Sequence, residues 1–283
     1  MKEKEFPWYR HPLVHCLTND ISSESVANAL LFVGAKPLMA EDLRELPSYI
    51  PRADSVLLNI ARLSPDREAS LKMAAQLAQK AAKPVVLDVV GIASSPLRLV
   101  LARELMTLVT PYVVKGNISE MRALCDLRSQ ARGVDGAAVD QDPSALRELK
   151  TALKNLAEDY PSTVFLATGA KDLLVCDQQC ALLENGIPEL DQFTGTGDMV
   201  GALIAASLTD RACIFRACVR MVSYFNICAQ VAQKEAKLKG LASIRIGVMD
   251  QLSLLYRSPS WWRKIKGEQD GGEDIRTLFG DSV

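Results

Sequence analysis

The chain has 283 residues, 48% of them hydrophobic, and a formal net charge of −1. Such a chain can bury the core of one large α/β domain or two small ones, and it lacks the basic field that would attract nucleic acid or an anionic membrane. No charge-free apolar run reaches the roughly 18 residues of a membrane span. The seven cysteines are an odd number, follow no secretory signal and favour reduced thiols in a cytoplasmic protein.

Strands and helices are predicted to alternate along most of the chain. Residues 1–12 are rich in charged and aromatic side chains, and this segment is predicted to form a loosely held arm. Short β-rich runs predict strands over residues 37–39, 55–60, 84–89, 112–114, 163–167 and 173–176. Helices are predicted over residues 22–33, 97–108, 118–125, 144–158, 198–208, 211–236 and 246–256. A further helix is predicted to start at Ser64, where a serine, a proline and an acid follow one another.

This alternation predicts an α/β fold with a mostly parallel central sheet and helices on both faces. Residues 1–257 are predicted to form one domain. Residues 126–143 are polar and rich in glycine and aspartate, and they predict a surface loop. Residues 258–283 carry two tryptophans and many charges, and they predict a charged C-terminal tail that is partly disordered.

Polar residues follow the predicted strands at their carboxyl ends, the edge where ligands bind in open α/β sheets. These residues are Asn59, Asp88, Lys115, Asn117, Glu120 and Thr168. All of them are therefore expected on one rim of the sheet.

The most distinctive stretch is Thr-Gly-Thr-Gly-Asp at residues 194–198, which runs into an apolar helix. The glycines let the backbone turn its N–H groups toward one point, and the helix start adds the positive end of its dipole. Gly195, Thr196 and Gly197 are therefore expected to form an anion hole, with the carboxylate of Asp198 on its edge. An anion hole beside a proton acceptor indicates phosphoryl transfer to an alcohol.

Two interpretations of the neighbouring acids are open at this point. Asn117 and Glu120 have the spacing of a capping box at the start of the helix over 118–125. Alternatively, Glu120 and Asp88 hold Mg²⁺ through oxygen or water contacts, with Lys115 close to a nucleotide phosphate. The sequence contains no Gly-x-x-x-x-Gly-Lys-Ser/Thr motif, which disfavours a P-loop NTPase.

Five segments resemble the hydroxyethylthiazole kinases of the ribokinase-like fold in their residues, order and separation. They are residues 12–19, 34–40, 57–60 with 63–65, 115–120 and 194–198. The resemblance covers about residues 10–257. It implies a kinase that uses ATP and Mg²⁺ to phosphorylate a small heterocyclic alcohol, hydroxyethylthiazole in thiamine salvage. It also implies a homotrimer with the site at a subunit interface.

The resemblance assigns roles to particular residues. Met39 and Gly195 match substrate-binding positions, and Asn19 lies in a segment expected near the thiazole alcohol. The wider ribokinase-like kinases have an aspartate as general base at the position of Asp198, where thiazole kinases usually have cysteine. The residues assigned to ATP are Lys115, Thr168 and Asn117.

Other departures from the family concern the pocket. Val89 replaces the proline of the family's Asp-Pro-Val-Gly turn, and Ala61-Arg62 replaces Gly-Thr, which adds charge and bulk near the expected pocket. These changes leave open a different alcohol of the hydroxymethylpyrimidine or pyridoxal type. They also leave open a homologue that binds the thiazole or a nucleotide without catalysis.

Overall fold

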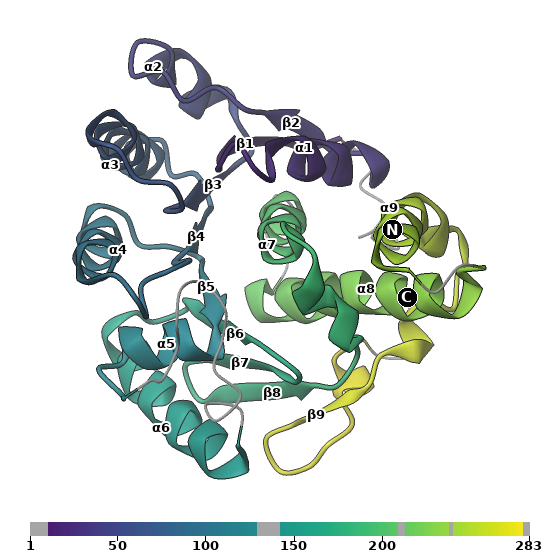
Figure 1. Cartoon of the computed structure of the whole chain (residues 1–283). Helices are drawn as coiled ribbons and strands as arrows, with labels where there is room; N and C mark the ends of the chain where they lie inside the picture. The colour runs from purple at the N-terminus through teal and green to yellow at the C-terminus, as the bar shows by residue number, and fades with distance from the viewer. Residues whose placement is uncertain (1–10, 129–141, 209–212, 238–239, 280–283) are drawn as a thin grey trace, which may run out of the picture.

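The computed structural model describes residues 11–128, 142–208, 213–237 and 240–279. The arm predicted over residues 1–12 and the loop predicted over residues 126–143 lie largely outside the described residues. In the described part, helices cover both faces of one curved sheet (Figure 1).

The described residues form nine strands, which lie in the order β2-β1-β3-β4-β5-β6-β7-β8-β9 across the sheet. Pairing is parallel from β2 to β6 and antiparallel from β6 to β9. The prediction of a mostly parallel sheet is therefore confirmed. The strands are β1 Leu13–Leu17, β2 Lys36–Leu38, β3 Ser55–Asn59, β4 Val85–Asp88, β5 Val113–Asn117, β6 Val164–Thr168, β7 Asp172–Cys176, β8 Gln179–Leu183 and β9 Gly267–Gln269.

The helices divide between the two faces of the sheet, each over its own apolar cluster. They are α1 Ser23–Phe32, α2 Leu46–Tyr49, α3 Pro65–Lys80, α4 Pro96–Leu108, α5 Ile118–Leu124, α6 Pro143–Asp159, α7 Thr196–Ser207, α8 Ile214–Glu235 and α9 Leu241–Leu254. Helices α1, α7, α8 and α9 lie on one side, and α3, α4, α5 and α6 lie on the other (Figure 1). None of the helices in this part of the chain combines the length and apolar character that a membrane crossing requires.

Local sequence explains where the helices nearest the rim begin. Ser64 caps α3 by accepting the Arg67 N–H at 3.2 Å, and Pro65 occupies the first helical position. Helix α7 starts directly after Gly195, whose φ of +94° is readily adopted only without a side chain. From Met199 onward α7 is buried, in contact with α1, α8 and the strands β1, β3 and β4. The first turn of α7 is therefore held firmly at the rim.

Three strands were not predicted from the sequence: β1, β8 and β9. Strand β1 contains His15, a polar residue that is fully buried because its Nε2 atom hydrogen-bonds the Ala40 carbonyl at 2.6 Å. Strands β8 and β9 are short and depend on antiparallel partners for their pairing. All three strands thus owe their place to contacts that local periodicity does not reveal.

The C-terminal segment differs from the predicted charged and disordered tail, because residues 258–279 are packed onto the molecule. Strand β9 pairs with β8 and covers the edge of the sheet (Figure 1). The carboxylate of Asp270 contacts the ammonium groups of Lys150 and Lys154 on α6. The apolar side chains that anchor this segment are widely spaced among charged residues. The sequence pattern therefore did not indicate that the segment packs against the core. The buried anchors are Trp261, Ile265, Ile275 and Phe279.

Candidate active site

The predicted rim residues occupy the carboxyl ends of neighbouring strands. Asn59, Asp88, Asn117 and Thr168 are the last residues of β3, β4, β5 and β6. The register sets Asn59 beside Asp88, Asp88 beside Lys115, and Asn117 beside Thr168. The parallel sheet therefore brings these side chains to one edge, as expected from the strand ends.

Asp198 lies in the first turn of α7 and its carboxylate is held from two sides. The side-chain amide of Asn19 donates to Oδ2 at 3.0 Å, and that of Asn59 donates to Oδ1 at 2.8 Å. The residue is half-buried. The carboxylate is thus fixed at the rim, where the helix N-terminus favours its negative charge.

The two asparagines can donate to Asp198 because the backbone fixes their orientation. The Oδ1 atom of Asn19 accepts the N–H groups of Ile21 and Ser22 at 3.0 and 3.1 Å. The Oδ1 atom of Asn59 accepts the Ala61 N–H at 2.9 Å. With each oxygen engaged, the NH₂ group of each amide points to Asp198. The sequence placed Asn59 on the rim but did not reveal this partnership.

Asp88 and Lys115 form an ion pair at the base of the site. The Lys115 Nζ atom lies 2.8 Å from Asp88 Oδ2, and the two side chains are 4% and 2% exposed. Burial raises the pKa of Asp88, and the charge of Lys115 opposes this rise. Burial also disfavours charge on Lys115, but the surrounding carboxylates outweigh it and raise its pKa, so the lysine stays protonated. The pair therefore supplies a buried cation beside Asp198.

The anion hole predicted at Gly195–Gly197 lies against this cation. A Cβ atom added at Gly197 would lie 3.2 Å from Lys115 Nζ, so the ammonium group approaches the first turn of α7 closely. A Cβ atom at Gly195 would lie 3.2 Å from Ser22 Cβ. The two glycines therefore allow α7 to start in contact with both the lysine and the loop that follows β1.

Glu120 forms the capping box that its spacing predicted. Its Oε2 accepts the Asn117 N–H at 2.6 Å, and Asn117 Oδ1 accepts the Glu120 N–H at 2.8 Å. Its Oε1 accepts the Gly91 N–H at 2.6 Å. Burial is the main cause that raises the pKa of Glu120 to about 7. This carboxyl group thus ties the turn after β4 to the start of α5, while its predicted role toward Mg²⁺ stays a prediction.

Thr168 and Met39 lie at opposite flanks of the rim. The hydroxyl of Thr168 donates to the Gly116 carbonyl at 3.3 Å, next to Asn117. Met39 directly follows β2 and packs, partly buried, against the apolar cluster on the α7 side. Within the described residues, no group of three or more His, Cys, Asp or Glu side chains is arranged to hold a metal ion.

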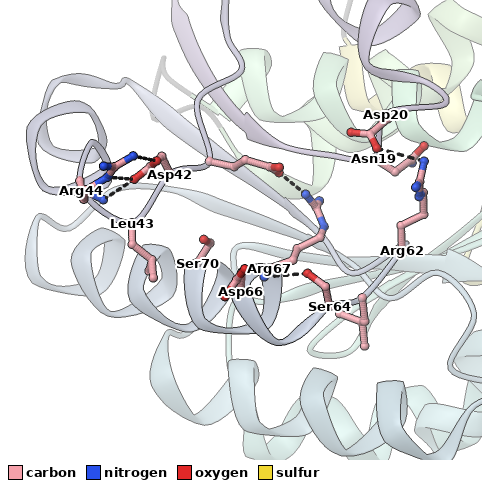
Figure 2. Close-up of a pocket in the computed structure, with 12 residues that line it drawn as sticks. Asn19, Asp20, Asp42, Leu43, Arg44, Arg62, Ser64, Asp66, Arg67 and Ser70 are labelled. Atoms are coloured by element: carbon pink, nitrogen blue, oxygen red, sulfur yellow. Dashed lines mark hydrogen bonds and ion pairs between the residues drawn. The ribbon is translucent and has the colours of Figure 1, made fainter.

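A cleft of about 800 Å³ opens beside Asn19, between the loops that follow β1, β2 and β3 (Figure 2). Arg62 lines it, as its sequence position predicted, and pairs with Asp20 at 3.0 Å. Sequence reasoning missed most of the other walls, which come from the loop after β2 and the first turns of α3. The full lining is Asn19, Asp20, Glu41, Asp42, Leu43, Arg44, Arg62, Leu63, Ser64, Asp66, Arg67 and Ser70.

The arrangement has the parts that phosphoryl transfer to an alcohol requires. A fixed carboxylate can take a proton, glycine amides at a helix N-terminus can stabilise negative charge, and a buried ammonium group adds a positive charge. An open cleft lies beside these groups at the carboxyl rim, and it shares with them Asn19, which holds the Asp198 carboxylate. Fold and site together define a kinase of small alcohols.

Comparisons with known proteins narrow this class. The sequence model of the Hydroxyethylthiazole kinase family matches residues 8–258. Hydroxyethylthiazole kinase of Lacticaseibacillus casei is 47% identical over 262 residues, which are 93% of each chain. The solved hydroxyethylthiazole kinase of Pyrococcus horikoshii OT3 superposes with a TM-score of 0.79 at 31% identity, over 92% of this chain and 94% of that chain.

A ribokinase-like superfamily protein from Enterococcus faecalis V583 superposes with a TM-score of 0.56 at 13% identity, over 86% of each chain, and so shows the fold alone. The chain belongs to the hydroxyethylthiazole kinase family, as the resemblance predicted. It is accordingly a phosphotransferase with an alcohol group as acceptor.

Proposed function

We propose that this enzyme transfers the γ-phosphoryl group of ATP to the primary alcohol of 4-methyl-5-(2-hydroxyethyl)thiazole, a step of thiamine salvage. Family membership supports the substrate. The observation that carries the chemistry is the Asp198 carboxylate, held by Asn19 and Asn59 at the N-terminus of α7 beside the protonated Lys115.

Asp198 is proposed as the general base. The alcohol oxygen bonds to the γ-phosphorus, the bond from that phosphorus to the β,γ-bridging oxygen breaks, ADP leaves, and the alcohol proton passes to Asp198. Because phosphoryl transfer is largely loose, positioning and charge stabilisation matter more than activation of the nucleophile. The N–H groups of Gly195, Thr196 and Gly197 supply the anion hole, where one donor is typically worth about 3–4 kcal/mol.

The remaining assignments rest on the family resemblance, and the position of each residue on the rim is compatible with them. Met39, Asn19 and Gly195 are proposed to bind the heterocyclic alcohol. Lys115, Asn117 and Thr168, at the ends of β5 and β6, are proposed to bind ATP.

Asp88 and Glu120 are proposed to hold Mg²⁺, which would neutralise charge on the ATP phosphates. Both are buried oxygen donors whose pKa values are raised mainly by burial, so a nearby cation would favour their charged forms. Both Glu120 oxygens already accept backbone N–H groups, so its contact would pass through water. The donor chemistry of the site thus suits a hydrated Mg²⁺ ion.

We also propose that the enzyme is a cytoplasmic homotrimer with the site near a subunit interface. All seven cysteines are free thiols, which suits a reducing compartment where ATP is supplied. Ile21, close to Asn19, is a large apolar side chain at the rim that is 65% exposed and could be covered by a partner subunit. Light scattering on a sizing column is expected to give three times the chain mass for the wild type and a smaller mass for Ile21→Asp.

The substrate is tested by a panel of alcohols with ATP and Mg²⁺, following ADP release and the mass of the product. Hydroxyethylthiazole should give the highest kcat/KM, ahead of hydroxymethylpyrimidine and pyridoxal. A higher value for another alcohol would reassign the substrate. Thiazole binding measured by calorimetry without any ADP release would identify a binding homologue instead of an enzyme.

Arg62 provides a second test of substrate choice. Its guanidinium pairs only with the exposed carboxylate of Asp20 among the contacts described, so its removal should barely change stability. Arg62→Asn, whose side chain tolerates the φ of +50° at this position, is expected to widen the cleft and raise kcat/KM for the larger pyridoxal relative to hydroxyethylthiazole. An unchanged ratio would show that Arg62 does not touch the alcohol.

A further inference from the structure

Arg67 is a buried cation in the wall of the cleft (Figure 2), and its guanidinium binds three acceptors. Its side chain is 8% exposed, compared with 56% for Arg62 and 88% for Arg44 in the same cleft. The Nε atom donates to the Ala61 carbonyl at 3.1 Å, and Nη2 donates to the Asn59 carbonyl at 3.2 Å. The Nη1 atom pairs with the carboxylate of Glu41.

The two carbonyls held by Arg67 belong to the turn that orients the Asn59 side chain. Within this turn the Ala61 N–H donates to Asn59 Oδ1, and the Asn59 amide donates in turn to Asp198. A shift of either carbonyl would therefore move the group that holds the proposed base. Arg67 itself is fixed, because α3 begins with the Arg67 N–H bonded to Ser64.

We propose that Arg67 is a positioning residue for phosphoryl transfer, which acts on Asp198 through the Asn59 turn. This inference rests on the proposed role of Asp198 as base. Through Glu41, Arg67 also joins this turn to the loop that carries Met39, so both sides of the alcohol site share one anchor. The planar fork of arginine suits three acceptors in different directions, whereas a lysine ammonium on its flexible stem does not reproduce that geometry.

The chain offers a matched control in Arg122. Its Nε and Nη1 atoms donate to the carbonyls of Arg128 and Ala145 at 3.0 and 3.1 Å, and Nη2 pairs with Glu148 at 2.8 Å. Its side chain is also 8% exposed. Arg122 thus has the same kind of contacts as Arg67 but joins α5 to α6, outside the cleft.

The experiment compares Arg67→Lys with Arg122→Lys by steady-state kinetics and thermal unfolding. Arg67→Lys is expected to lower kcat by about 10–100-fold, since small misplacements of reacting groups cost up to that much, with KM for ATP nearly unchanged. Arg122→Lys should lower the melting temperature to a similar degree and keep kcat within about twofold of the wild type. Equal effects of the two changes on kcat would overturn the proposal.

The milder variant Glu41→Gln keeps an acceptor for Arg67 and serves if Arg67→Lys does not fold. Glu41→Gln should lower kcat by a smaller factor than Arg67→Lys. An unchanged kcat in this folded variant would contradict the positioning role of Arg67.

A double variant separates this inference from the role of Asp198. If Arg67 acts through Asp198, Arg67→Lys should cost little further kcat in an Asp198→Asn background. If Arg67→Lys lowered kcat by the same factor in the Asp198→Asn background as in the wild type, Arg67 would act by another route and the proposal would be overturned. Normal turnover of Asp198→Asn alone would instead remove the base, and the comparison of Arg67→Lys with Arg122→Lys would then decide whether Arg67 positions the site.

Discussion

Asp198 illustrates how a short side chain is fixed by residues remote in sequence. Its two partners, Asn19 and Asn59, lie at the carboxyl ends of two different strands, and each uses its side-chain oxygen to hold the local backbone. Only their NH₂ groups remain for the carboxylate, so its two oxygens have set directions. The half-buried position leaves the carboxylate accessible from the rim.

Asp198→Asn is expected to reduce turnover at least about 100-fold, the usual contribution of a general base. The loss of charge at the start of α7, and of the acceptor for one of the two asparagine amides, should destabilise the fold by about 1–3 kcal/mol. Asp126→Asn is a suitable control, because Asp126 pairs with Arg103 of α4, contacts none of the rim residues described above and has a φ of +57° that asparagine tolerates. Near-normal kcat in Asp198→Asn would exclude it as the base.

Some site residues were predictable from the sequence and others were not. Asn59, Asp88 and Thr168 end apolar runs, and a parallel sheet brings all such ends to one edge. Arg67 and Glu41 gave no comparable signal, because they are 26 residues apart and meet only after the loops beyond β2 and β3 fold together. The partnership of Asn59 with Asp198, 139 residues away, is equally invisible in a local pattern.

At the scale of elements, the start of α7 depends on Gly195. Its φ of +94° is in the left-handed region, and an added Cβ atom would press on Ser22. Gly195→Ala should therefore cost about 1–2 kcal/mol of stability, and it should also lower kcat/KM because the proposed anion hole would shift. Gly271→Ala has a similar φ of +90° but no atom within 4 Å of the added carbon, so it should lose stability and keep kcat/KM. A normal kcat/KM for Gly195→Ala would argue against the anion hole.

The C-terminal segment is a second element with a testable role. Ending the chain after Arg257 would remove β9 and uncover the edge of β8. It would also remove the Trp261 ring, which packs edge-on against the Tyr224 ring with 4.9 Å between the ring centroids. Open strand edges pair with other chains, so the shortened protein should melt at lower temperature and associate. Differential scanning calorimetry and light scattering test this expectation.

The full-length variant Ile275→Asp should have a similar effect, because Ile275 is fully buried within that segment. If the shortened chain melted like the full chain and kept its mass, the segment would be dispensable to the sheet.

The helices other than the short α2, and the strands from β2 to β7, were predictable because their apolar residues recur with the period of the element. Strand β1 was missed because its buried His15 is compatible with a strand only through its bond to Ala40, 25 residues away. Strand β9 was missed because charged residues surround it. Local pattern therefore predicted the parallel core of the sheet better than its antiparallel edge.

At the scale of the whole molecule, buried acids make stability depend on pH. Burial raises the pKa of Asp172 from 3.8 to about 7, although the Gly169 N–H and the Asn226 amide offset part of this rise. Between pH 3.8 and about pH 7, the Asp172 carboxyl group is protonated in the folded protein and ionised in the unfolded chain. The contribution of Asp172 to stability is therefore complete below about pH 4 and is lost as pH rises through 7.

The free energy of unfolding is accordingly expected to be lower at pH 8 than at pH 6, measured by urea titration. Asp172→Asn should reduce this difference, and Glu120, whose pKa is raised in the same direction, should account for part of what remains. An equal pH dependence in the variant and the wild type would show that Asp172 does not carry the effect.

The order of the strands also has a consequence for synthesis on the ribosome. From β4 to β8, each strand lies beside the one made just before it, so this stretch can assemble while the chain is still growing. The helix that carries Asp198 emerges after β8, and the strand that closes the sheet edge emerges later still. A nascent chain that ends just after β8 therefore has most of its sheet and an open sheet edge, but it lacks Asp198, the proposed general base.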